Sequence, residues 1–393
     1  MIDVSEAAVR RRTQGLARPD DDLGRLQALD ARMLWAALTE PGDGVAGALV
    51  GALGAREALE LVLHRRGSER LMERCGLDAA AAHAAVRRWR ARAGDAPHAV
   101  SAAQRAGVRV LTPEAGPWPA RVDDLGPHAP LCLWVRGEVS AVVAPAATVA
   151  LVGARAATSY GEHVVAELAA ELGRGRASIV SGGAYGIDGM AHRAALAAGA
   201  VTVAWLAGGV DRAYPAGHRA LLDQVVASGG ALVGEAPCGA APTKWRFLAR
   251  NRLIAAGSDA TVVVEAGWRS GSLNTAGHAA ALGRPLGAVP GPITSATSAG
   301  CHRLLREYAA QCITSADDVR ELIGWRSTPA DPGSSADTLS RVQEALSGRA
   351  ARTPEELARR SGLDIDAVES ALGLLALDGA ARRVGDGWCA PAR

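Results

Sequence analysis

Apolar residues in the first 95 positions recur with the spacing of amphipathic helices. They cluster at 33–38, 49–53 and 59–62, and a Pro-Gly-Asp-Gly turn at 41–44 separates two of the clusters. We expect residues 1–95 to form a helical domain similar to a SAM or helix-hairpin-helix domain. Its turn fits either plain helical packing or a helix-hairpin-helix that contacts DNA phosphates.

From residue 105 onward, short runs rich in β-branched residues alternate with helical stretches. Strands are expected at 108–111, 131–135, 148–152, 178–181, 201–206, 261–265 and 287–290. Helices are expected at 161–172, 188–198, 217–226 and 274–282. Such alternation is typical of parallel strands joined by helical crossovers. It predicts an α/β fold, an extended Rossmann-like doubly wound parallel sheet over residues 105–325.

The last part of the chain begins with a segment rich in Pro, Ser, Gly and Asp at 326–337, which we expect to be a linker. Three short helices and a hairpin are expected after it, at 338–346, 354–360, 365–377, 381–384 and 387–389. This order predicts a winged-helix-like domain over 338–393. Its third helix carries Asp364, Asp366 and Glu369 and no basic residue, which favours a protein-contact or regulatory role over major-groove binding.

Composition narrows the ligands that the chain can take. The chain has 43 Lys and Arg against 41 Asp and Glu, a net charge of +2, which excludes a broadly polybasic DNA binder but allows a local basic patch. Every basic residue is arginine except Lys244, and the one phenylalanine, Phe247, is three residues away. Excess arginine and alanine most simply reflect a GC-rich genome, so drift toward arginine does not account for the retained lysine.

The sequence shows little sign of a membrane span, a secretory signal or a metal site. No apolar run reaches the ~18 residues of a membrane span, and the N-terminus lacks the apolar core of a secretory signal. The six cysteines have neither the CxxC nor the Cys/His spacing of a zinc site. We expect them to be buried apolar residues in a reducing cytoplasm, and we expect no metal and no cofactor.

The segment 152–161 leaves a strand and enters a helix, a usual place for an anion. Arg155 stands where a dinucleotide fingerprint needs its second glycine, so an NAD site is not expected. An arginine beside backbone N–H groups suits a phosphate or a stacked base. An ordinary turn with a surface arginine is the alternative.

The segment 181–188 places three glycines after a strand, so that free N–H groups can cradle a phosphate. It lacks the Lys-Ser/Thr ending of a P-loop, and no Mg-nucleotide chemistry is expected. Asp188 and His192 lie one helical turn apart. They form either a metal or acid–base pair or, more simply, a helix cap and a core histidine.

The segment 244–252 combines the lysine, the phenylalanine, a tryptophan and three arginines. In a helix, Lys244, Phe247 and Asn251 share one face, so that cations hold phosphates while a ring stacks a base. A solvated basic face with an aromatic ring in the core is the alternative. The segment 269–275 places Ser, Gly and Thr at a further strand-to-helix turn. All these turns are expected to meet in one crevice at the carboxyl edge of the sheet.

In this order the motifs resemble the DNA-processing protein A (DprA/Smf) family. The resemblance runs through about 105–315 and is carried by Trp118-Pro119, 133–137, 152–155, 181–192, Tyr214-Pro215, 250–254, 270–276 and Pro290-Gly291. The chain departs from the family at 300–305, where Gly-Ser/Thr-Asn-Leu is usual. It also departs at Ala184-Tyr185, where a basic residue often lies.

The resemblance implies a non-catalytic protein that binds and protects single-stranded DNA and loads the RecA recombinase in natural transformation and recombination. It also implies a homodimer through the Rossmann-like core. By the same resemblance, the DNA-binding residues are Gly153, Arg155, Ser181, Gly182, Gly183, Gly186, Lys244, Phe247, Arg250, Asn251, Arg252, Ser270, Gly271, Ser272 and Thr275.

Two other functions stay open. Rossmann-like enzymes of the lysine-decarboxylase-like (LOG) family hydrolyse nucleoside monophosphates with a Gly-Gly-x-Gly-Thr-x-x-Glu loop. Here Gly277 and His278 follow Thr275, and the acid–base glutamate is missing. A transcription regulator would bind duplex DNA with the terminal winged helix, which the acidic third helix disfavours.

Overall fold

The computed structural model describes residues 2–63, 76, 78–325, 335–348, 350–377 and 379–391. The chain divides into two compact units, Met1–Trp325 and Arg326–Arg393. Among the described residues, no helix is long and apolar enough to cross a membrane. The predicted linker lies mostly at 326–334, outside the described residues.

Nine strands form one sheet in the described part of the first unit, in the order β1-β2-β6-β5-β4-β3-β7-β8-β9. They are β1 (Arg109–Leu111), β2 (Leu133–Gly137), β3 (Thr148–Gly153), β4 (Ser178–Ser181), β5 (Thr202–Leu206), β6 (Ala231–Gly234), β7 (Ala260–Glu265), β8 (Leu286–Ala288) and β9 (Gln311–Cys312). Neighbouring strands from β6 to β9 are parallel, and β2 pairs antiparallel with β1 and β6. The predicted α/β class is confirmed. The sequence pattern missed β6, whose four residues include one β-branched side chain, and β9, which has two residues.

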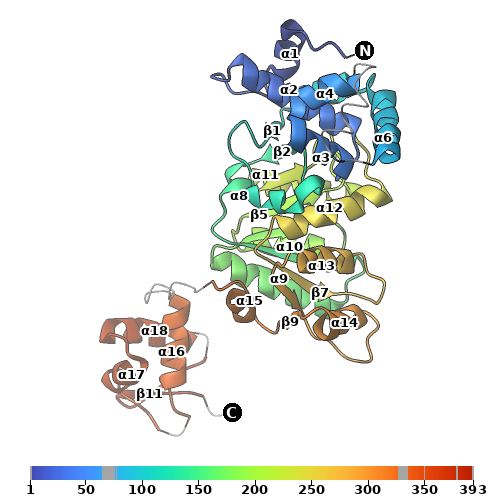
Figure 1. Cartoon of the computed structure of the whole chain (residues 1–393). Coiled ribbons are helices and arrows are strands. Elements are labelled where there is room, and N and C mark those ends of the chain that lie inside the picture. The colour runs from blue at the N-terminus through green and yellow to red at the C-terminus, as the bar shows by residue number, and fades with distance from the viewer. Residues whose placement is uncertain are drawn as a thin grey trace. The chain divides into compact units, whose positions relative to one another are not determined.

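Helices cover both faces of this sheet (Figure 1). In the core region they are α8 (Ser140–Val143), α9 (Ser159–Arg174), α10 (Ile187–Ala197), α11 (Arg219–Ala227), α12 (Lys244–Ala256), α13 (Ser272–Ala281), α14 (Ala299–Glu307) and α15 (Ala316–Leu322), with 3-10 turns η1 (Ala120–His128) and η2 (Ala216–His218). One apolar cluster packs α9 and α10 on the sheet, and another packs α12 and α13. Because alternate residues of β3 and β7 enter the two clusters, both strands are buried on both faces.

The strand order reverses at β3. Chain order runs outward from β3 through β4, β5 and β6, and then returns to place β7 on the other side of β3. Helices after β3 and β7 therefore leave on opposite faces, and the carboxyl ends of these two strands open a crevice.

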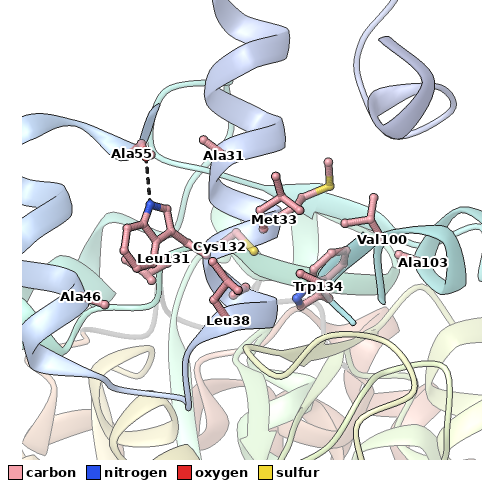
Figure 2. Packing of buried hydrophobic residues seen from close by; sticks show 14 of the residues in the cluster. Ala31, Met33, Leu38, Ala46, Ala55, Val100, Ala103, Leu131, Cys132 and Trp134 are labelled. Carbon is pink, nitrogen blue, oxygen red and sulfur yellow. Dashed lines mark hydrogen bonds between the residues drawn. The ribbon is translucent and has the colours of Figure 1, made fainter. Parts of the chain in front are cut away.

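The helices of the first 106 residues are packed on the β1 end of the sheet (Figure 1). They are α1 (Glu6–Thr13), α2 (Leu23–Leu38), α3 (Gly44–Leu53), α4 (Ala55–Leu63), α6 (Ala79–Arg92) and α7 (Ala96–Ala106). Figure 2 shows Met33 and Leu38 of α2 gathered with Val100 of α7 near Cys132 and Trp134. The helical segment expected to stand as a domain thus shares a hydrophobic cluster with the sheet.

The second unit has the predicted three helices and hairpin. They are α16 (Ser335–Ala345), α17 (Pro354–Ser361), α18 (Ile365–Leu377), β10 (Arg382–Val384) and β11 (Gly387–Cys389). The two strands pair antiparallel, and a small apolar core that includes Val342, Leu357 and Leu372 holds the helices together. The winged-helix-like prediction is confirmed.

Candidate functional site

A crevice of about 730 Å³ opens at the carboxyl ends of β3 and β7, beside α12. From the predicted residues it brings together Gly153, Arg155, Lys244, Phe247, Arg250, Asn251, Ser270, Gly271, Ser272 and Thr275. Its lining does not include Ser181, Gly182, Gly183, Gly186 or Arg252. Segments that are far apart in the sequence therefore meet here, as the strand order requires.

Helix α12 forms one wall of the crevice. Thr243 caps the helix by accepting a hydrogen bond from the N–H of Arg246 at 3.3 Å. Lys244, Phe247 and Asn251 follow at helical spacing and all line the crevice. The Asn251 amide donates to Asn274 Oδ1 at 3.2 Å and ties α12 to α13.

Phe247 lies among cations. The Arg155 guanidinium carbon is 4.9 Å from the centre of the phenyl ring, and that of Arg250 is 5.9 Å away. The ring of Tyr214, another lining residue, lies 5.7 Å from Phe247 at an interplanar angle of 54°. The crevice therefore combines an aromatic surface with positive charge, the pairing that bases and phosphates require.

Three exposed cations at the crevice have no ion-pair partner among the described residues: Lys244, Arg155 and Arg269. Lys244 is also the first residue of α12, where the helix dipole is positive and does not stabilise a cation. By contrast, Arg246 on the same helix is paired with Glu40 at 2.8 Å. Positive potential is therefore left uncompensated in the crevice.

In the glycine loop after β4, two of the N–H groups that the sequence predicts to be free have a partner within the chain. The backbone N–H groups of Gly182 and Ala184 donate to Asp188 Oδ2 at 3.1 and 3.4 Å. Burial raises the pKa of Asp188, although Arg250 lies near enough to oppose the shift. Asp188 therefore takes two N–H groups of the loop, and the phosphate cradle predicted there stays a prediction for the remaining ones.

Three more of the predicted site residues, Arg250, Gly186 and Ser181, make contacts within the protein around this loop. The Arg250 guanidinium donates to the carbonyls of Gly182, at 2.7 Å, and Trp205, and burial lowers its pKa to about 10. A Cβ atom at Gly186 would lie 2.3 Å from the carbonyl oxygen of Ala154, so only glycine lets the loop pack on that turn. Ser181 is buried and donates to the carbonyl of Leu151 at 2.7 Å.

A second predicted anion position is also occupied. At the start of α9, the N–H and hydroxyl of Thr158 each donate to the Glu265 carboxylate at 2.8 Å. At the start of α13, the N-cap residue is Gly271, which has no side chain to cap the helix. Ser270 and Ser272 lie there with their hydroxyl oxygens 2.7 Å apart. The N–H groups of Ser272, Leu273 and Asn274 are used within this turn, so the start of α13 offers an anion its serine hydroxyl groups beside Arg269.

Arg252 points away from the crevice. Its guanidinium makes two hydrogen bonds to Glu235, at 2.7 and 2.9 Å, and both side chains are buried. Glu235 also accepts the N–H of Gly42 at 3.0 Å. The turn at 41–44 is thus tied to the core by the N–H of Gly42, and its Asp43 caps α3 by accepting the N–H groups of Val45 and Ala46.

His192 and Asp188 do not form a pair. The buried ring of His192 lies 2.7 Å from the hydroxyl of Thr202, and burial lowers its pKa to about 3. Within the described residues, no group of three or more His, Cys, Asp or Glu side chains is placed to hold a metal. Cys132, Cys238, Cys301 and Cys389 are free and buried, whereas Cys312 is free but exposed, which corrects its predicted burial. Cys75 lies outside the described residues.

Sequence reasoning did not name Tyr214, Thr243 or Arg269 as site residues. Tyr214 belongs to a Tyr-Pro motif that the sequence does show, but only the tertiary structure places its ring beside Phe247. Arg269 directly precedes the Ser-Gly-Ser motif of the predicted nest. An unpaired arginine next to a predicted anion nest is a signal that could have found it.

Comparison with known proteins points to one family. A sequence model described as DNA recombination-mediator protein A matches residues 109–324, and one described as DprA winged helix domain matches residues 326–387. The putative DNA processing protein DprA of Mycobacterium tuberculosis (strain ATCC 25618 / H37Rv) is 46% identical over 352 residues, covering 84% of this chain and 86% of that protein. The DNA processing protein DprA of Bacillus subtilis (strain 168) is 37% identical over 192 residues, covering 49% and 64%. The X-ray structure of DNA processing protein A from Streptococcus pneumoniae is similar with a TM-score of 0.58 and 29% identity, over 74% of this chain and 95% of that one.

Proposed function

The chain belongs to the DNA recombination-mediator protein A family, as its motifs predict, and from this membership and the crevice we propose that it binds single-stranded DNA without catalysis. The binding serves DNA processing in natural transformation and recombination. The observation that carries the proposal is Phe247, an aromatic ring in a crevice whose exposed cations are unpaired among the described residues.

In the proposed mechanism, cations bind the phosphates and the phenyl ring of Phe247 binds a base. Lys244, Arg155 and the serine hydroxyl groups at the start of α13 hold phosphates, because positive charge attracts anions and hydroxyl groups can donate to them. Phe247 stacks one base. A base offers its face only when it is unpaired and unstacked, so the crevice favours single strands over duplex and tolerates any sequence.

Two partners are part of the proposal. RecA recombinase would receive the bound strand, in keeping with the family's description as a recombination mediator. A second copy of the chain would bind through the sheet-bearing unit, so that two crevices act on one strand. The proposed compartment is the reducing cytoplasm, because the five described cysteines are free.

The direct test compares single-stranded with double-stranded DNA. In a mobility-shift titration at low salt, the whole chain is expected to bind oligo-dT more tightly than a duplex of the same length, and binding should weaken steeply as salt is raised. Equal or stronger duplex binding would overturn the proposal. If the fragment 335–391 alone carried the duplex affinity, the winged-helix regulator would become the better explanation.

Replacing Phe247 by alanine is expected to weaken oligo-dT binding by roughly 5- to 150-fold, because a stacked base contributes ~1–3 kcal/mol. The slope of affinity against salt should not change, since no phosphate contact is lost. Phe247→Trp retains a ring and should keep most of the affinity. Fluorescence anisotropy of a labelled oligo-dT at several salt concentrations measures both quantities. If Phe247→Ala binds as tightly as the unaltered chain, the base does not stack on this ring.

The enzymatic alternative has little support in the crevice. Asp188 is the carboxyl group that lines it, and Asp188 Oδ2 already accepts two backbone N–H groups. Both oxygens of the buried Glu265 carboxylate accept hydrogen bonds from Thr158, the N-cap residue of α9, and Glu265 is not among the residues that line the crevice. We therefore expect no adenine release when the chain is incubated with AMP and the products are separated by chromatography. Steady turnover that is lost in Asp188→Asn would make hydrolysis the main function.

A further inference from the structure

Two exposed tryptophans are sequence neighbours of residues that line the crevice. Trp245 is 75% exposed and Trp268 is 59% exposed. Trp245 directly follows the lining residue Lys244, and Trp268 lies between the lining residues Gly267 and Arg269. The other described tryptophans are buried or partly buried. An indole left in water forgoes a large hydrophobic gain, so two such rings next to one crevice indicate a ligand that covers them.

The side chain of Arg303 lies against the ring of Trp268. The guanidinium carbon of Arg303 lies 5.2 Å from the centre of the Trp268 ring and 5.7 Å from that of Tyr308. Arg303 is itself held by Glu307, with Nε 2.7 Å from Oε2. A fixed cation against the ring orients the indole. The exposed remainder of its surface is free to stack on a flat partner.

The crevice alone is too small for a long strand. Its volume of about 730 Å³ lies in the range of sites that take a single small molecule. A strand held at Lys244 and Phe247 must therefore continue over the rim. The rim carries Trp245 at the start of α12 and Trp268 in the loop between β7 and α13.

We propose that Trp245 and Trp268 are further base-stacking platforms, which extend the single-strand site beyond the crevice on two elements of its rim. The inference rests on the proposed single-strand binding. In this longer site, the outer bases of the strand stack on the indole rings, and its central phosphates bind the unpaired cations. Stacking of this kind accepts every base, since each has an aromatic face.

The test separates the outer platforms from the crevice by oligonucleotide length. Affinities are measured for oligo-dT of about 4 and of about 20 nucleotides, the span of single-strand sites. Trp245→Ala and Trp268→Ala are each expected to weaken binding of the long oligomer by roughly 5- to 150-fold and to leave the short one within about twofold. Trp245→Phe and Trp268→Phe should retain most of the affinity. Tyr308→Ala is the matched control, because it removes the other ring beside Arg303.

Each outcome decides a separate point. If neither length binds to the unaltered chain, the proposed function itself fails. If both lengths bind and Lys244→Gln weakens both, but the two Trp→Ala variants bind the long oligomer normally, the crevice stands and the outer platforms do not. If the Trp→Ala variants instead change the sedimentation mass with no change in DNA affinity, the rings belong to a protein interface and the inference is overturned.

Discussion

Replacing Lys244 by glutamate is expected to weaken oligo-dT binding at low salt by at least roughly tenfold while leaving the fold intact. The side chain is exposed and has no ion-pair partner in the described part of the chain, so its loss removes no contact that holds α12. A carboxylate at the first position of a helix even suits the dipole. The loss in affinity therefore reports on phosphate binding and not on stability.

The salt dependence provides a second readout. Removing one phosphate contact should reduce the slope of log affinity against log salt by about 1 for Lys244→Gln, with little dependence on base sequence. Arg174→Glu is the matched charge reversal. Arg174 is exposed and is the last residue of α9, a helix of 16 residues. It therefore lies roughly 22 Å from the first turn of α9, which is the end of the helix near the crevice. If Lys244→Glu and Arg174→Glu bind alike, Lys244 does not contact the strand.

Replacing Arg252 by methionine is expected to destabilise the first unit by about 3–5 kcal/mol and to leave oligo-dT affinity of the folded protein within about twofold. Removing the guanidinium leaves the buried carboxylate of Glu235 uncompensated, which is costly. Adding Glu235→Gln should recover most of the loss, because Gln is uncharged and still accepts the N–H of Gly42. Urea unfolding, followed by tryptophan fluorescence, measures these differences.

Arg246→Met on the same helix is the control for Arg252. Arg246 pairs with Glu40, a residue about half exposed, and breaking that pair should cost about 1 kcal/mol or less. A strong loss of oligo-dT affinity in folded Arg252→Met would contradict the structure and would return Arg252 to the DNA-binding set. A loss of stability no larger than that of Arg246→Met would show that the buried pair contributes little.

The outline of the site could be predicted because strand-to-helix turns leave a local signature. The Ser-Gly-Ser motif at 270–272 and the basic segment at 244–252 each follow from composition and spacing, and both line the crevice. Which members of the basic segment face the strand could not be predicted. Arg250 and Arg252 are two residues apart, yet one lies against the crevice and the other against Glu235.

For the glycine loop at 181–186, too, the sequence predicts the local structure but not which groups are free to bind a ligand. Three glycines after a strand indicate an anion nest, and the nest does form around a carboxyl group. That group is Asp188, six residues after Gly182, so a side chain of the protein itself takes two N–H groups of the loop. Periodicity and motif spacing do not distinguish a free nest from an occupied one, since the two have the same local residues.

The sequence by itself determined the α/β class, the winged-helix-like unit, the family and the helical face that presents Lys244 and Phe247, because each depends on residues close together in the chain. Only the tertiary structure decided which N–H groups remain free and which cations remain unpaired. Those outcomes depend on contacts such as Thr158 with Glu265 and Arg246 with Glu40, between residues 107 and 206 positions apart. A charge that is neutralised from so far along the chain leaves no mark on the local pattern, and for that reason the uncompensated charge of the crevice emerged only from the fold.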